Sequence, residues 1–384
     1  MGLEFDFTAD HKIDGTNVLR SCMLSAEITS ANPSQELNYT RYFTELEEAD
    51  LFSGMVLIAK GDSVIYEGAH GFFDKKEQVP LQLDHQLVIA STTKLFTAVA
   101  IAQLVEMGKI ELDEPVSTYL TDFPKQVGGK VTAAHLLTHT SGLELDELDG
   151  FMEDIEQARL VDDFYQLNLR YLPQLETFDN FAPLDEHDYS NENFDIMGKL
   201  IEVLTGQDFY AYLDAQIFKP LDMTQTGPID MEQDRPNIAH NYQLDRSLGG
   251  DTDSGYRNEV PNSNLSLSRP AGSFHSNPRD LYLFMKALFS GELIKDKTLQ
   301  TFATKHVENL VIPIYQSWYG YGFYISERNG IVNIGHAGGA PGISSRCEYY
   351  SEQDVYVIVT SNYNGSANLV ANYLGSTVSA IAEK

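Results

Sequence analysis

Residues 91–105 read Ser91-Thr-Thr-Lys-Leu-Phe-Thr-Ala-Val-Ala-Ile-Ala-Gln-Leu-Val105, and the rest of the chain is organised around them. From Leu95 onward this stretch is apolar on nearly every face, so as a helix it would be buried all round, and Gly108 offers it an end. A buried helix whose only polar part is its first turn places that turn at an internal site, where free N–H groups face inward. We therefore expect a functional site at Ser91.

Lys94 follows Ser91 by three residues, so both side chains lie on the same helix face. Desolvation lowers the pKa of a buried lysine, and the neutral amine can then take the proton of a hydroxyl and make it a nucleophile. The plainer interpretation is a serine cap and a solvated lysine. Because this is the only S-x-x-K in the chain, we take Ser91 and Lys94 as a candidate acylation pair.

Asp188-Tyr-Ser-Asn191 precedes an amphipathic helix predicted over residues 193–204. A tyrosine hydroxyl beside a lysine ammonium loses its proton more easily and can relay protons, and Asn191, two residues on, points to the same side. The alternative is a simple helix-entry loop with Asn191 as a cap. A second Y-x-N at Tyr256 lies in a Gly- and Asp-rich loop with no helix after it, so Tyr189 is preferred.

The stretch 334–342, Ile-Gly-His-Ala-Gly-Gly-Ala-Pro-Gly, follows a predicted strand and is crowded with glycine. Glycines let a backbone approach a ligand closely, and an N–H here can help the Ser91 N–H bind an oxyanion. The alternative is a flexible turn with a surface histidine at His336.

The spacing of His135 and His139 places two imidazoles on one helix face if the helix continues, as in a metal site. No Glu follows His135 and no third ligand is evident, so we expect helix capping and no metal or organic cofactor. A G-x-S-x-G nucleophile elbow is absent, which argues against an α/β-hydrolase.

Composition narrows the classes of protein. The 384 residues carry 56 acidic and 26 basic side chains, a net charge of −30, which disfavours nucleic acid and anionic membrane surfaces as partners. No apolar stretch is long enough to cross a bilayer. The start of the sequence has no signal-peptide pattern and Cys22 and Cys347 suggest no disulfide framework, so we expect a cytoplasmic protein, or a periplasmic or secreted one if the sequence is part of a longer chain.

Two predicted strands, 54–60 and 63–69, flank a Gly61-Asp62 hairpin turn near the start, and strand patterns return only at 322–361. Helical patterns fill the region between, with long loops at 144–190 and 227–270. We predict an α/β protein of the α+β type, in which a five-stranded antiparallel sheet is flanked by N- and C-terminal helices. The predicted division is an extension of unknown role at 1–33, a sheet domain of 34–90 plus 290–384, an inserted helical domain at 91–289, and a site at their junction.

Ser91-x-x-Lys94, Tyr189-x-Asn191 and His336-x-Gly338, in this order and at these separations, resemble the serine β-lactamase and penicillin-binding-protein superfamily. The similarity is greatest to its class C β-lactamase-like branch, with DD-peptidases and β-lactamase-like esterases, and runs from about residue 35 to the C-terminus. Further stretches similar to that branch are Leu112-Asp-Glu-Pro-Val, His135-Leu-Leu-Thr-His-Thr-Ser-Gly142, Lys219-Pro-Leu-Asp-Met223, Pro270-Ala-Gly-Ser and Arg279-Asp-Leu281.

The resemblance implies that Ser91 attacks a carbonyl to form an acyl-enzyme that water releases. Lys94 and Tyr189 would share the base and acid roles, with the first base left open. Asn191 would hydrogen-bond the substrate or Lys94, and the N–H groups of Ser91 and Gly339 would form the oxyanion hole.

The third motif departs from the family pattern. β-Lactamases of this branch carry Lys-Thr-Gly, whereas this chain has His336-Ala337-Gly338 and no K-x-G at all. Ala337 lacks the hydroxyl that would bind a substrate carboxylate, which weakens the case for β-lactams and for peptides ending in D-alanine. We therefore expect a serine hydrolase of small esters or amides. The alternatives are a DD-peptidase, D-amino-acid peptidase or penicillin-binding protein with weak β-lactamase activity, and a non-catalytic binding protein; the oligomeric state stays open.

Overall fold

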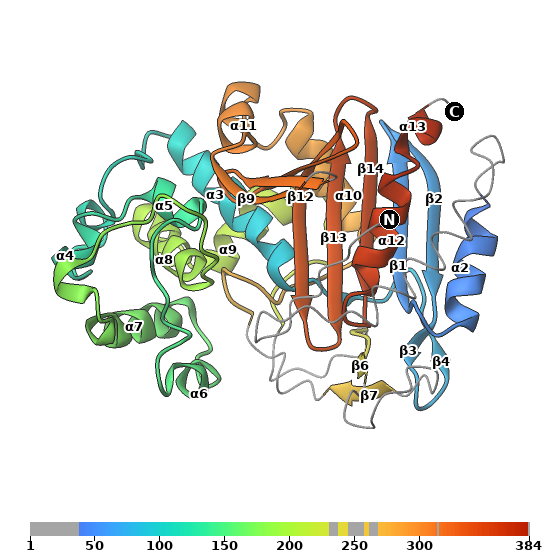
Figure 1. Ribbon diagram of the computed structural model, residues 1–384, viewed down its shortest axis with the longest axis horizontal. Helices are drawn as coiled ribbons and strands as arrows, with labels where there is room; N and C mark the ends of the chain where they lie inside the picture. Colours follow the sequence, from blue (N-terminus) through green and yellow to red (C-terminus); the bar gives the residue numbers. More distant parts are fainter. Residues whose placement is uncertain (1–37, 230–236, 245–256, 261–267, 313–314, 383–384) are drawn as a thin grey trace.

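A computed structural model describes residues 38–229, 237–244, 257–260, 268–312 and 315–382. At its centre lies one antiparallel sheet with helices on both faces (Figure 1). The strands follow one another across the sheet in the order β2 (Ser63–His70), β1 (Gly54–Lys60), β14 (Val355–Ser361), β13 (Ile343–Tyr350), β12 (Ile331–Ala340), β11 (Tyr324–Arg328), β10 (Tyr315–Tyr319) and β9 (Val307–Ile312). The prediction of an α/β fold with an antiparallel sheet is confirmed.

Strands from the two ends of the chain pair with each other in this sheet. Strand β1 pairs with β14 from Gly54 opposite Ser361 to Lys60 opposite Val355. Both faces of β1 are buried, because Val56 and Ile58 pack toward the terminal helices while Leu57 and Ala59 pack on the other side. Burial on two faces explains why β1 is a continuous apolar run rather than an alternating one.

The predicted count of five strands is wrong, since the sheet in the described residues has eight. Strands β9 and β10 were missed. They form an edge hairpin of mixed polar and apolar residues. All six residues of β9 are partly buried or exposed, and the buried residues of β10 are Ser317 and Tyr319. Without a buried stripe, periodicity does not mark a strand.

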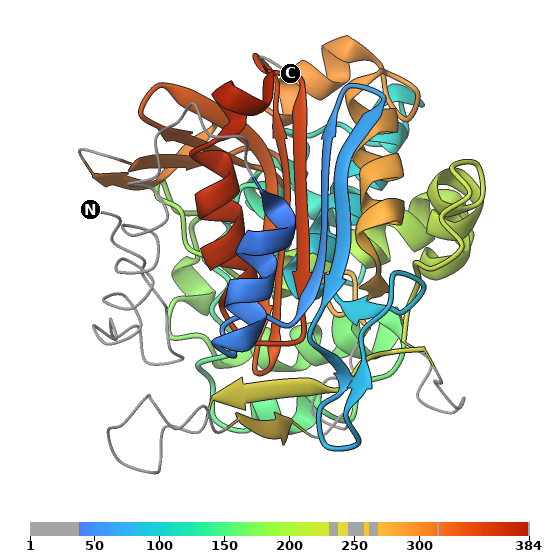
Figure 2. The ribbon, with the colours of Figure 1, turned by 90° about the vertical axis from the view of Figure 1, so that its right-hand side faces the viewer.

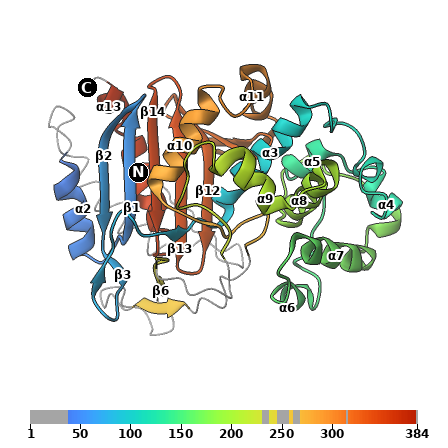
Figure 3. The ribbon, with the colours of Figure 1, turned by 180° about the vertical axis from the view of Figure 1, so that it is seen from behind.

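Helices form a layer on each side of the sheet (Figures 2 and 3). One layer holds α2 (Tyr39–Glu48), α12 (Ser366–Gly375) and α13 (Val378–Ala382), and the other holds α10 (Pro278–Phe289), with α3 (Lys94–Glu106) behind β12. The flanking terminal helices are as predicted, except that the expected single helix over 367–382 is divided into α12 and α13. Among the described residues, no helix has the length and apolarity to cross a membrane.

The helical part beside the sheet contains α4 (Lys125–Gly128), α5 (Ala133–Leu137), α6 (Phe151–Ile155), α7 (Val161–Tyr171), α8 (Glu192–Thr205) and α9 (Phe209–Leu213). Helices α6 and α7 occupy the stretch 144–190 that was predicted to be a long loop. Every residue of α3 from Lys94 to Leu104 is buried, as its sequence predicts, and the left-handed Gly108 (φ 65°) follows its end. One apolar core joins α3 and α10 to the sheet, so the division into two domains stays a prediction.

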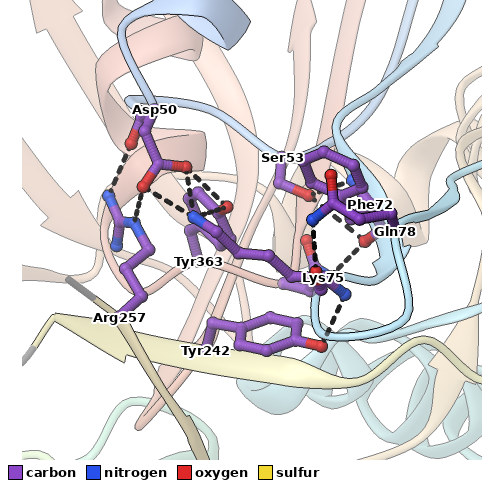
Figure 4. Close-up of polar contacts among 9 residues, drawn as sticks. Asp50, Ser53, Phe72, Lys75, Gln78, Tyr242, Arg257 and Tyr363 are labelled. Atoms are coloured by element: carbon purple, nitrogen blue, oxygen red, sulfur yellow. Dashed lines mark hydrogen bonds and ion pairs between the residues drawn. The ribbon is translucent and has the colours of Figure 1, made fainter. Parts of the chain in front are cut away.

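A polar cluster ties together segments at one end of the sheet (Figure 4). The Lys75 ammonium lies 2.7 Å from both carboxylate oxygens of Asp50, and the Tyr363 hydroxyl donates to Asp50 Oδ1 at 2.7 Å. Arg257 of β7 (Arg257–Val260) donates to the Asp50 carbonyl oxygen at 3.0 Å, and the Lys75 N–H donates to the hydroxyl of Tyr242 in β6 (Asn241–Leu244) at 2.8 Å. Asp50 thereby anchors the β6–β7 hairpin beside the end of β14.

Candidate active site

Ser91 lies in a tight turn of 3₁₀ type, η1 (Ala90–Thr93), that leads directly into α3. Ala90 has a left-handed backbone (φ 43°), which is uncommon for a residue with a side chain and marks strain of the kind stored at functional sites. Two hydrogen bonds hold the turn. The Thr93 hydroxyl donates to the Ala90 carbonyl oxygen at 2.7 Å, and the Ser345 hydroxyl of β13 donates to the Ile89 carbonyl oxygen at 2.7 Å. These bonds fix the turn against the sheet.

Lys94 is fully buried and its ammonium nitrogen faces three oxygen atoms. Nζ lies 3.2 Å from Ser91 Oγ, 2.7 Å from Asn191 Oδ1 and 2.6 Å from the Ala271 carbonyl oxygen. Burial lowers the pKa of Lys94 well below its usual value, and the nearby Arg269 cation lowers it further. The structure therefore brings the Ser91 and Lys94 side chains together.

Tyr189 also contacts Ser91. Its hydroxyl donates to Ser91 Oγ at 2.9 Å, and Lys94 Nζ lies 4.8 Å from the centre of its ring. Although the residue as a whole is 36 % exposed, desolvation raises the pKa of the phenol above its usual value. Asn191 stands at the N-cap position of α8 but makes no capping hydrogen bond there, because its side chain binds Lys94. Tyr256, the other Y-x-N tyrosine, lies outside the described residues.

Three ionisable side chains lie beside Lys94, and the sequence motifs did not reveal them. Arg269 Nε donates to Asp195 Oδ1 at 2.9 Å, Nη2 also contacts Asp195 Oδ2, and Nη2 lies 3.3 Å from Glu192 Oε1. Burial raises the pKa of Asp195 to about 6. Asp195 and Glu192 partly offset the effects of burial and of Arg269 on the pKa of Lys94. The sequence offered one signal for Arg269, because this residue directly precedes the family-like stretch Pro270-Ala-Gly-Ser. The Ala271 carbonyl oxygen in that stretch accepts a hydrogen bond from Lys94.

Strand β12 brings the glycine-rich stretch against the Ser91 turn. A Cβ atom on Gly338 would lie 3.0 Å from the Ser91 nitrogen, 2.5 Å from Ser345 Oγ and closer still to the Ile89 carbonyl oxygen. A Cβ on Gly339 would meet nothing within 4 Å. The close contact between β12 and the Ser91 turn therefore requires a glycine at position 338, whereas position 339 borders open space.

His336 lies inside β12, which continues past the predicted strand end at Gly335; its side chain is only 2 % exposed and both ring nitrogens are occupied. Nδ1 lies 2.5 Å from the Ala337 carbonyl oxygen and so donates its hydrogen there, while Nε2 accepts from the Tyr319 hydroxyl at 2.8 Å. Burial, with Lys94 nearby, lowers the pKa of His336 to about 3. The ring is neutral and has no nitrogen left for a substrate. Ala337 projects from the opposite face of the strand to His336 and Gly338.

His135 and His139 do not share a helix face. Helix α5 ends at Leu137, and His139 beyond it has a left-handed backbone (φ 56°). His135 Nδ1 accepts the Thr132 N–H at 3.1 Å in a capping box, so the expected capping role is confirmed for this residue. No group of three or more His, Cys, Asp or Glu side chains within the described ranges could hold a metal ion.

The family model described as Beta-lactamase matches residues 40–375. The chain is 28% identical to the putative penicillin-binding protein PbpX of Bacillus subtilis (strain 168) over 321 residues, 83% of this chain and 72% of that protein. It is 34% identical to the esterase EstB of Burkholderia gladioli over 200 residues, half of each chain.

Two solved structures resemble the whole fold. A penicillin-binding protein from Bacillus halodurans aligns with a TM-score of 0.72 at 27% identity, covering 87% of this chain and 98% of that one. A D-amino acid amidase from Ochrobactrum anthropi SV3 aligns with a TM-score of 0.71 at 23% identity, over 90% of this chain and 98% of that one, and shows likeness of fold alone. Because the family model spans most of the described chain and its relatives are named as hydrolytic or penicillin-binding proteins, this chain belongs to the beta-lactamase family and is a serine hydrolase.

Proposed function

We propose that Ser91 is the nucleophile of an acyl-enzyme mechanism and that Lys94 is its first base. The observation that carries the proposal is the convergence of two groups on one oxygen: Lys94 Nζ at 3.2 Å and the Tyr189 hydroxyl at 2.9 Å from Ser91 Oγ. A serine hydroxyl is a weak nucleophile until a neighbouring base takes its proton.

The hydrogen-bond pattern around Lys94 supports the neutral amine. A neutral amine has two hydrogens and one lone pair. The two shorter contacts, to Asn191 Oδ1 and the Ala271 carbonyl oxygen, are to pure acceptors and use the two hydrogens. The lone pair is then free for the Ser91 hydroxyl proton, and the lowered pKa of Lys94 makes this form accessible.

The steps follow from this arrangement. Lys94 takes the Ser91 proton as Oγ bonds to the substrate carbonyl carbon, and the N–H groups of Ser91 and Gly339 hold the resulting oxyanion. The carbon–oxygen or carbon–nitrogen bond of the leaving group then breaks. The leaving group takes the proton of the Tyr189 hydroxyl, which recovers one from the Lys94 ammonium. Water attacks the acyl-enzyme by the same proton path in reverse.

Charge near the site favours small neutral esters or amides as substrates. His336 is neutral and fully bonded, and β12 contains no lysine or arginine that could bind a substrate carboxylate. Glu144 hydrogen-bonds Asp188, next to Tyr189, and this hydrogen bond with its burial and like-charge neighbours raises the pKa of Glu144 to about 7. A hydrogen-bonded pair of carboxyl groups shares one proton and keeps one negative charge, which disfavours an anionic substrate nearby. We therefore propose esterase activity over penicillin hydrolysis or cleavage of peptides with a free carboxylate.

The test is hydrolysis of p-nitrophenyl acetate by the wild type, S91A and S63A, followed by mass spectrometry after incubation with benzylpenicillin. Ser63 is exposed in β2, so S63A is a matched control and should equal the wild type. We expect turnover that S91A abolishes, with slow or no penicillin adduct.

Turnover that survives in S91A would contradict the assignment of Ser91 as the nucleophile. Rapid penicillin turnover would overturn the proposed preference for neutral esters. Absence of both turnover and adduct in the wild type would favour the non-catalytic binding protein.

A further inference from the structure

His139 is a fully buried imidazole beside the proposed active site that takes no part in the steps above. We propose that His139 is a positioning residue that holds the Tyr189 hydroxyl on Ser91. This inference deepens the proposed function and rests on it. Three kinds of contact between His139 and residues 188–190 carry it.

His139 holds the tyrosine segment from both ends and from one ring face. Its carbonyl oxygen accepts the Asp188 N–H at 2.7 Å, and its Nδ1 accepts the Ser190 N–H at 3.1 Å. Between these two bonds, the imidazole stacks on the Tyr189 ring with centroids 4.2 Å apart and an interplanar angle of 29°. One residue therefore holds the backbone N–H groups of both neighbours of Tyr189 and packs on its ring.

Two nitrogen donors face Nδ1 of this ring, and Nε2 has no hydrogen-bond partner among the described residues. Besides the Ser190 N–H, the Asn193 amide nitrogen lies 3.3 Å from Nδ1, and the Ser141 hydroxyl donates to Asn193 Oδ1 at 2.5 Å, which sets the orientation of that amide. With two donors directed at it, Nδ1 is the acceptor and the ring hydrogen is on Nε2. Burial and the nearby Lys94 lower the pKa of His139 well below its usual value, in agreement with a neutral ring.

The backbone of His139 is also unusual. Its φ of 56° is in the left-handed region, which costs a residue with a side chain on the order of 1 kcal/mol and which glycine or asparagine adopts more easily. The position nevertheless carries a large ring packed between Tyr189 and Phe194, whose ring centre is 5.3 Å away. A purely structural turn would not need that ring.

The position of Tyr189 needs such support because the residue is 36 % exposed, so burial of the ring alone does not hold it. In a proton relay, a misplacement of about 1 Å costs about 100-fold in rate. Loss of the His139 contacts should therefore lower the chemical rate more than substrate binding.

The experiment compares H139F and H139N with the matched control H135N. H139F keeps an aromatic ring but removes the acceptor for the Ser190 N–H. H139N keeps an acceptor near the Nδ1 position and tolerates the left-handed backbone, but it loses the stack. His135 also accepts a backbone N–H through Nδ1, that of Thr132 at 3.1 Å, but it caps α5 rather than contacting Tyr189.

The readouts are kcat and KM on p-nitrophenyl acetate per active site, counted by titration with a fluorophosphonate that phosphonylates Ser91 Oγ and releases fluoride. We expect kcat of H139F to fall by about 100-fold and of H139N by about 10-fold, with KM within about threefold and H135N unchanged. A structural role alone would lower the number of titratable sites and leave kcat per site intact, and that result would overturn the proposal.

A measurement on the wild type keeps the proposal testable if H139F does not fold. The ¹⁵N chemical shifts of the His139 imidazole should show an unprotonated Nδ1 and a protonated Nε2 at neutral pH. A protonated Nδ1 could not accept the Ser190 N–H and would contradict the proposal. If S91A stays active, the proposed function fails whatever the His139 variants do, so the two failures are distinguishable.

Discussion

At the scale of the residue, one buried amine accounts for the proposed base chemistry. An arginine in place of Lys94 stays protonated at any pH that the protein survives and so cannot accept the Ser91 proton. We expect K94R to lower kcat/KM for p-nitrophenyl acetate by about 1,000-fold. K109R, at an exposed lysine whose ammonium donates to the Leu204 carbonyl oxygen, should have wild-type activity and serves as the control.

The pH dependence of the wild type follows from the same amine. Because only the neutral form accepts a proton, kcat/KM should rise with pH through the lowered pKa of Lys94 and reach a plateau well below pH 10. The unfolded chain keeps its lysine proton up to about pH 10.4, so this group makes folding more favourable as pH rises toward that value. A pH–rate profile in which kcat/KM rises only near pH 10.4 would contradict the assignment of Lys94 as the base.

His336 gives a second prediction at this scale. Its pKa is about 3 in the folded protein and about 6.5 in an unfolded chain, so the unfolded state binds the proton first as pH falls. The His336 contribution to the free energy of unfolding is therefore lost between about pH 6.5 and pH 3. We expect the Tm of H336N to fall less than that of the wild type between pH 7 and pH 5. Equal shifts in Tm would show that His336 does not titrate as described.

At the scale of the element, contact between β12 and the Ser91 turn makes two adjacent glycines unequal. In G338A the new methyl group would meet the Ser91 nitrogen, Ser345 Oγ and the Ile89 carbonyl oxygen, so the strand must move away from the turn. We expect a loss of about 100-fold in kcat/KM and a lower Tm. In G339A the methyl group enters open space and the N–H is kept, so activity should stay within a few fold and Tm should be unchanged. Similar effects of the two substitutions would contradict the placement of β12.

At the scale of the whole molecule, Asp50 joins segments that are far apart in the sequence (Figure 4). D50N removes the charge that faces both Lys75 and Arg257, whose side chains are 25 % and 9 % exposed. Because breaking a partly buried ion pair leaves cations without a counter-charge, we expect D50N to destabilise the protein by about 2 kcal/mol. D62N removes the exposed Asp62–Lys286 pair and should cost less than about 0.5 kcal/mol. Equal midpoints in urea unfolding of D50N and D62N would contradict this difference.

Several features of this protein could be read directly from its sequence. The buried helix α3, the hairpin of β1 and β2, the end of α8 at Gly206 and the order of the three motifs each depend on neighbouring residues, through apolar runs and turn chemistry. That strands from both ends of the sequence share one antiparallel sheet was also predicted, because no other strand patterns were available to complete it, whereas the pairing of β1 with β14 is known only from the structure.

Only the tertiary structure decided how distant side chains meet. His336 Nε2 accepts from the Tyr319 hydroxyl, and the Ala271 carbonyl oxygen accepts from Lys94. His139 Nδ1 accepts the Ser190 N–H next to Tyr189. The eight-stranded width of the sheet belongs here too, since β9 has no buried residue and the buried positions of β10 are one serine and one tyrosine. Local patterns follow from the helix and strand periods, whereas these contacts depend on packing between segments that are separated by 17 to 177 residues.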